Sequence, residues 1–207
     1  MLEISNITNK IIRVSSSSTI ELAKHFIRFQ EYYESPYWRG KIFTIEEYEA
    51  WYKKTNGAFT YYQDWIGFNI PSWVLKPFYS GLFSPLSNKE IDLLNLFTNR
   101  NDDFYIIGSQ DNNSLEHELA HGFFYTIKEY RDSVTKIISD NKEHLQTLFS
   151  YLANSEYHEV THIDEAHAYA GVDIEFIKKK SISIPREVHS QLINLFESTI
   201  RQHGILL

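Results

Sequence analysis

Residues 117–121 read His-Glu-Leu-Ala-His, a pattern that can hold a divalent metal. Two histidines four residues apart project from one face of a helix, so His117 and His121 can bind one ion with two imidazoles. A bound metal lowers the pKa of water, and Glu118 is placed to take the proton as a general base. The chain has no Cys, so histidines and carboxylates are its strong metal ligands. This segment therefore predicts a Zn²⁺ site.

The same pattern occurs a second time, as His-Glu-Val-Thr-His at residues 158–162. Only the first copy follows a short β-prone run and a possible helix cap, Asn113-x-x-Glu116. If the helix of the second copy continues, His158, His162, Glu165 and Tyr169 lie along one stripe. We interpret this second helix as the source of a further ligand for the first motif.

A catalytic zinc normally takes three protein ligands and keeps one position for water. Glu165 is the candidate for the third ligand, and His162 is a less favoured one. Tyr169 could donate a hydrogen bond to a developing oxyanion, which makes it a candidate catalytic residue beside Glu118.

The segment 164–169, Asp-Glu-Ala-His-Ala-Tyr, together with His-Glu-Leu-Ala-His, resembles the gluzincin (thermolysin-like) metallopeptidases. In that family a Glu on a second helix completes the zinc site within a motif N-E-A-x-S-D. Here Ala168 stands in place of Ser, and Tyr169 stands in place of the Asp that orients a histidine ligand. Asp164 could take over that orienting role. The resemblance implies a small, divergent bacterial member that hydrolyses a peptide or protein substrate, and the strand at 104–107 could pair with an extended peptide.

Two other functions use the same residues. Glu118-x-x-His121 and Glu159-x-x-His162 also match the paired ExxH units of di-iron carboxylate bundles, which need further Glu ligands, here Glu143 and Glu165. Such a protein would be an oxidoreductase or an iron-binding protein. The other alternative is a metal-stabilised interaction protein without catalysis, whose site would lack an open coordination position.

The elements that must position these residues predict an α+β fold that is mainly helical. A short strand at 104–107 leads into the helix that carries the first motif, and a second helix carries the third metal ligand. Another strand is expected at 10–14, with Thr19 as a possible cap of the helix that follows. The aromatic block 58–85 favours irregular packing. Helices are predicted at 20–33, 44–54, 87–97, 114–130, 133–153, 155–179 and 185–203.

The bulk composition fits one folded domain of 207 residues, with an aromatic-rich part at 1–100 and a zincin-like metal-binding part at 101–207. Hydrophobic residues make up 43% and aromatic residues 15%, which argues against disorder. A net charge of -7 gives no basic surface for nucleic acid. The N-terminus lacks a signal-peptide pattern, and no stretch approaches the roughly 18 apolar residues of a membrane span. We expect a cytoplasmic protein and leave its oligomeric state open.

Overall fold

The computed structural model describes residues 2–110, 112–155 and 157–206, apart from the side chains of 112 and 113. The predicted α+β, mainly helical class is confirmed. The chain divides into two compact units, residues 1–111 and 112–207. This boundary falls after the short strand before the first motif, so the strand belongs to the first unit and the motif to the second.

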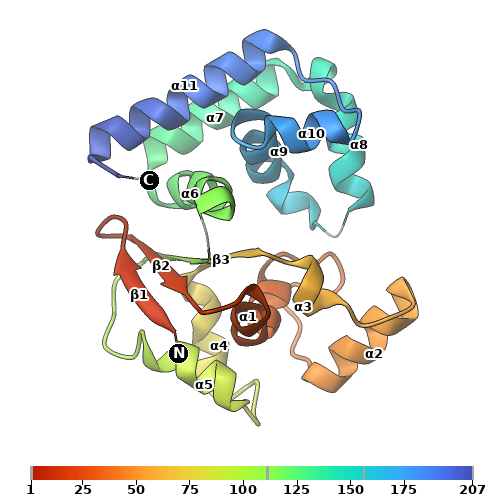
Figure 1. Ribbon diagram of the computed structural model, residues 1–207, viewed down its shortest axis with the longest axis vertical. Helices are drawn as coiled ribbons and strands as arrows, with labels where there is room; N and C mark the ends of the chain where they lie inside the picture. The colour runs from red at the N-terminus through yellow and green to blue at the C-terminus, as the bar shows by residue number, and fades with distance from the viewer. Residues whose placement is uncertain (1, 111, 156, 207) are drawn as a thin grey trace. The chain divides into compact units, whose positions relative to one another are not determined.

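A four-stranded sheet forms the centre of the first unit, in the order β1-β2-β4-β3 (Figure 1). Strand β2 (Ile11–Ser15) runs parallel to β4 (Tyr105–Ser109), and both are rich in the β-branched residues that favour strands. The two edge strands, β1 (Glu3–Asn6) and β3 (Gly67–Pro71), pair antiparallel. Because β4 is bonded to a strand on each side, the expectation that it pairs with an extended peptide is wrong.

The longer helices of the first unit begin at the residues that the sequence marks as caps. Helix α1 (Thr19–Glu34) is capped by Ser18, one residue before the predicted Thr19. The predicted capping boxes form at the starts of α2 (Ile45–Asn56) and α5 (Asn88–Asn95). The aromatic block contains short elements in place of one long one: α3 (Tyr61–Asp64), strand β3, the 3-10 helix η1 (Ser72–Leu75) and α4 (Lys76–Tyr79).

The core of the first unit lies where α1 packs on strands β3 and β4. The rings of Phe26 and Phe68 stack there with their centroids 5.3 Å apart. Gly108 on β4 leaves room for both rings, since an added Cβ would lie 2.9 Å from the Phe26 ring and 3.0 Å from Cβ of Phe68. A side chain at this position would therefore disturb the contact between helix and sheet.

The second unit consists of helices, and three of the predicted long helices are divided. The predicted helix 114–130 becomes α6 (Asn112–Thr126) and the start of α7 (Lys128–Asp140), with the break at Ile127. The predicted capping side chain, Asn113, lies outside the described side chains. The predicted helices 133–153 and 155–179 are also divided into shorter elements. The remaining elements of this unit are the 3-10 helices η2 (Lys142–Leu145) and η3 (Glu159–Thr161) and the helices α8 (Gln146–Asn154), α9 (His162–Gly171), α10 (Ile174–Lys179) and α11 (Arg186–His203).

Helix α9 lies in the middle of the second unit and packs against α6, α7, α8, α10 and α11 (Figure 1). Its small residues Ala166, Ala168 and Ala170 are completely buried, which lets neighbouring helices approach closely. Phe123 of α6 and Phe196 of α11 add an aromatic contact at 5.6 Å. This packing fixes α6 and α9 as the two helices that carry the motif residues. In the described part of the chain, no helix has both the length and the apolarity to cross a bilayer.

Candidate metal centre

Three predicted ligands come together in the second unit: His117 and His121 from α6 and Glu165 from α9. Their potential ligand atoms all lie within 4.8 Å of one another, and all three residues are buried. The two Nε2 atoms are 3.1 Å apart, and Glu165 oxygens lie 3.7 Å from His121 Nε2 and 3.9 Å from His117 Nε2. Two ligands of one tetrahedral zinc lie about 3.3 Å apart, as bond lengths of about 2.0–2.1 Å require. The spacing is therefore compatible with one zinc ion.

Each histidine is anchored by a carboxylate through its other ring nitrogen. Nδ1 of His121 lies 2.8 Å from Oδ1 of Asp164, and Nδ1 of His117 lies 2.8 Å from Oδ2 of Asp173. An ionised carboxylate only accepts hydrogen bonds, so the hydrogen bond between His121 and Asp164 places the proton of that ring on Nδ1. Nδ1 of His117 contacts Asp173 at ion-pair distance without the geometry of a hydrogen bond. In the neutral His121 ring the Nε2 lone pair then faces Nε2 of His117 and the carboxylate of Glu165. Such a convergence of lone pairs and negative charge calls for a cation, and the donor set suits zinc.

The surrounding charges act on the histidines in the same direction. Burial disfavours the charged form of His121, but the negative charges of Asp164 and Glu165 outweigh it and raise its pKa well above the ordinary value. Burial also acts to lower the pKa of His117. The interaction with Asp173 acts in the opposite direction and prevails, so the pKa of His117 lies above its ordinary value. The cluster thus attracts positive charge.

Asp173 contacts the candidate metal cluster, and sequence reasoning did not predict it. It occupies the N-cap position of α10, where an Asp normally accepts a hydrogen bond from the helix, yet its side chain makes no capping bond. Asp173 lies between α9 and α10, and its carboxylate pairs with His117 of α6. An Asp before a short helix reads as a cap in the sequence, so no spacing signal marked its role. Asp164, in contrast, takes the orienting position that the sequence suggested for it.

Glu118 is buried on α6 next to the ligand histidines. Its negative charge is among the causes that raise the pKa of both His117 and His121. It is not one of the three converging residues. This arrangement agrees with the predicted division between ligands and general base, and the role of Glu118 in catalysis stays a prediction.

Tyr169 lies against the cluster, with its ring centroid 4.9 Å from that of His117. Burial, followed by the negative charge of Glu165, raises the pKa of the phenol well above its ordinary value, so the hydroxyl keeps its proton. The hydroxyl oxygen lies 2.8 Å from that of Tyr157, a neighbour that the sequence did not single out. Tyr169 is therefore a neutral O–H group beside the candidate metal ligands.

The second His-Glu-x-x-His copy does not form a comparable site. Residues 159–161 form η3 and α9 begins only at His162, so the expected continuous helix from His158 to Tyr169 is wrong. His158 accepts a hydrogen bond from the Val160 amide at 3.2 Å. His162 lines a different, open pocket with residues of α7, η2 and α8 and is not among the described residues that converge with His117.

The geometry needed for a di-iron site is not formed by the residues proposed for it. Glu143 on η2 and Glu159 on η3 are both exposed. Within the described part of the chain, the group of potential ligands consists of His117, His121 and Glu165. It includes neither Glu143 nor Glu159. The structure thus groups the ligands for one ion.

His167 lies behind Asp164 and is fully enclosed by the helices. Its Nδ1 donates a hydrogen bond to the Asp164 carbonyl, and its ring stacks on Phe124 at 5.3 Å. Burial lowers the pKa of His167 to about 4, so the ring is neutral near pH 7. The ring of His167 also makes an edge contact with that of His121, with the centroids 6.1 Å apart, so this residue packs against the cluster beside Asp164.

Comparisons with protein-family models, curated proteins and solved structures give no match for this chain. The likeness to gluzincins is therefore carried by the motif residues between 117 and 169 alone.

Proposed function

We propose that this chain is a zinc-dependent hydrolase, most naturally a small gluzincin-like peptidase that acts on a peptide or protein substrate. The observation that carries the proposal is the convergence of two carboxylate-anchored imidazoles, His117 and His121, with Glu165 in a buried cluster. This combination of two histidines and one Glu is a ligand set of catalytic zinc sites.

His117, His121 and Glu165 would hold the ion. The described residues supply three ligand atoms within 4.8 Å of one another, which leaves one position of a tetrahedral ion for water or substrate. A structural zinc would instead be closed by a fourth protein ligand. The open position favours catalysis over a purely stabilising role.

The bound zinc would supply Lewis acidity, which polarises a substrate carbonyl and makes water easier to deprotonate. Glu118 takes the proton from the attacking water and returns it to the leaving amine. Tyr169, which stays neutral, donates a hydrogen bond to the oxygen that gains negative charge. Asp164 keeps the imidazole of His121 in the tautomer that presents Nε2 to the ion, and the charge of Asp173 lies against Nδ1 of His117.

The first experiment is elemental analysis of protein purified without added metal. We expect about one zinc per chain, lost in His117→Ala and kept in His144→Ala, a matched change at an exposed histidine of the same unit. Two irons per chain would contradict the zinc assignment and favour the di-iron alternative.

The second experiment separates metal binding from catalysis. Hydrolysis of casein and of a mixed fluorogenic peptide library is measured for the wild type and for Glu118→Gln. The variant should keep its zinc and lose at least about a hundredfold in activity, the contribution typical of a positioned general base. Full activity in the variant would refute the role of Glu118. A zinc-loaded wild type that cleaves no member of the library would refute the peptidase assignment.

A further inference from the structure

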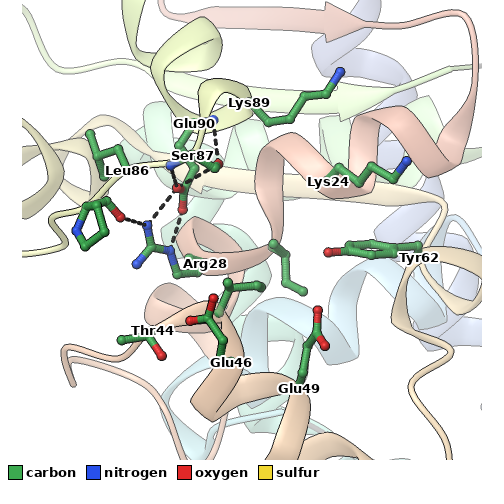
Figure 2. Close-up of a pocket in the computed structure, with 13 residues that line it drawn as sticks. Lys24, Arg28, Thr44, Glu46, Glu49, Tyr62, Leu86, Ser87, Lys89 and Glu90 are labelled. Carbon is green, nitrogen blue, oxygen red and sulfur yellow. Dashed lines mark hydrogen bonds and ion pairs between the residues drawn. The ribbon is translucent and has the colours of Figure 1, made fainter.

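The first unit contains a cavity of about 470 Å³ that belongs to no part of the candidate metal centre. This volume falls within the range of small-molecule sites, roughly 300–1,000 Å³. Figure 2 shows its walls, which come from α1, the start of α2, Tyr62 of α3, and the loop that leads into α5. The lining residues on which the ligand class depends are Ile27, Ile45, Glu46, Glu49, Tyr62 and Leu86.

The cations in the wall already pair with carboxylates of the protein. Arg28 pairs with the buried Glu90 through Nε at 2.5 Å and Nη2 at 2.7 Å, and its remaining donors bond the carbonyls of Phe43, Phe83 and Pro85. Lys24 and Lys89 both pair with Glu21, at 2.9 and 2.5 Å. Their ammonium groups point away from the Arg28–Glu90 pair in Figure 2. The Arg28–Glu90 pair is neutral, whereas the two lysines share one carboxylate and keep one unit of positive charge, which is directed away from that pair.

The carboxylates of α2 face the cavity with less compensation. Glu46 and Glu49, three residues apart on one helix face, point toward the space between α1 and α2 (Figure 2). Glu49 has an exposed ion pair with Lys53 at 3.3 Å. For Glu46, the described part of the chain holds no ion-pair partner within 4.0 Å. Burial, followed by the charges of Glu49 and Glu90, raises the pKa of Tyr62, so its hydroxyl stays neutral.

Apolar side chains make up a further part of the lining and point to an organic ligand. Ile27 is buried, and Ile45, Tyr62 and Leu86 are partly buried around the same space. Glu46 and Glu49 belong to no group of three or more described residues with metal-ligand spacing, so a divalent metal ion is not the expected occupant. We infer that this cavity binds a small organic ammonium compound, with its charged head at Glu46 and Glu49 and its apolar body against Ile27, Ile45 and Leu86.

Three probes that share one apolar body test this inference on the full-length chain. Phenethylamine is the cation, phenethyl alcohol its neutral counterpart, and hydrocinnamate an anion of similar size. Binding is measured by calorimetry and by NMR shifts at low salt, because exposed charges are screened at high ionic strength. The amine should bind about tenfold more tightly than the alcohol, and the anion should bind more weakly than either.

Conservative variants locate the charged head. Glu46→Gln and Glu49→Gln should each weaken amine binding up to about fivefold and together about tenfold, with the alcohol unaffected. Glu3→Gln, a matched change on the exposed strand β1, should alter neither. Leu86→Trp should fill the cavity and abolish binding of amine and alcohol alike, and a thermal melt checks that this variant is folded.

Equal affinity for amine and alcohol would overturn the inference, as would unchanged amine affinity in the double Gln variant or no binding of the amine at all. Amines can also coordinate zinc, so the titration is repeated on a variant with His117→Ala and His121→Ala. The same affinity is expected there. Loss of amine binding in that variant would place the amine at the metal cluster and overturn the assignment to this cavity.

Discussion

Nδ1 of His117 lies 2.8 Å from Oδ2 of Asp173, the residue at the N-cap position of α10. The equivalent partner of His121 is Asp164, one residue before the candidate ligand Glu165. Thus the two imidazoles receive their carboxylates from different parts of the chain, one from within α9 and one from the turn after it. The side chain of Asp173 is 35% exposed and that of Asp164 only 11%, so solvent screens the first pair more strongly.

This difference gives a ranked prediction for the two carboxylates. Asp164→Asn and Asp173→Asn should each lower zinc affinity by roughly 10–100-fold, because they remove the charge that orients the ligand and raises its basicity. The loss should be larger for Asp164, whose pair is less exposed. Competition with a fluorescent zinc chelator measures both affinities.

Asp132→Asn is the matched control, since Asp132 is exposed on α7 and pairs only with Lys128 among the described residues. Its zinc affinity should equal that of the wild type. Wild-type affinity in both Asp164→Asn and Asp173→Asn would show that the two carboxylates do not support the metal ligands.

A second prediction distinguishes the two candidates for the third ligand. Glu165→Ala should reduce bound zinc well below the expected one per chain, because two histidines alone leave the ion weakly held. His162→Ala should leave zinc content and affinity unchanged, since His162 lies in a separate pocket. Elemental analysis after gel filtration measures both variants. Zinc loss in His162→Ala with retention in Glu165→Ala would reverse the assignment.

The candidate ligands on α6 could be predicted because their geometry is local. A spacing of four residues places His117 and His121 on one helix face wherever that helix lies. Glu165 required a second inference, that another helix supplies the remaining ligand, and the structure brings this residue to the histidines. Asp173 could not be predicted, because its position depends on how the chain turns between α9 and α10.

The second motif copy shows the limit of pattern spacing. His158 and His162 have the same spacing as the first pair, but α9 starts at His162 and the residues before it form a 3-10 turn. The side-chain directions of an α-helix therefore do not apply to His158. A similar limit affected β1, because its residues Glu3–Asn6 are all exposed and Ile4 is the one apolar residue among them, too little to mark an apolar face. Tertiary pairing with β2 makes this segment a strand.

A third prediction concerns the buried ion pair in the first unit. Arg28→Met should lower the free energy of unfolding by about 3–5 kcal/mol, because it leaves the buried carboxylate of Glu90 without its charged partner and three carbonyls without this donor. Lys128→Met breaks an exposed pair with Asp132 and should change stability by no more than about 0.5 kcal/mol. Urea unfolding measures both. Similar losses in the two variants would contradict the distinction between buried and exposed pairs.

The last prediction is that the free energy of unfolding depends on pH through a histidine of α1, in the first unit. Burial lowers the pKa of His25 below its ordinary value of 6.5, although a hydrogen bond from Nδ1 to the Glu21 carbonyl at 2.6 Å acts in the opposite direction. The unfolded chain therefore binds a proton at this residue at higher pH than the folded chain does. Stability from this group is complete above about pH 6.5 and falls as the pH decreases from there toward the folded pKa, by at most about 1.4 kcal/mol per pH unit.

His25→Gln removes this titration while its amide can still donate to the Glu21 carbonyl. Between pH 7 and pH 5, measured by urea unfolding, the variant should lose less stability than the wild type, and the difference between the two profiles isolates His25 from the other histidines. His144→Gln, at an exposed histidine, should follow the wild-type profile. Parallel profiles for the wild type and His25→Gln would mean that the folded protein does not disfavour protonation of His25.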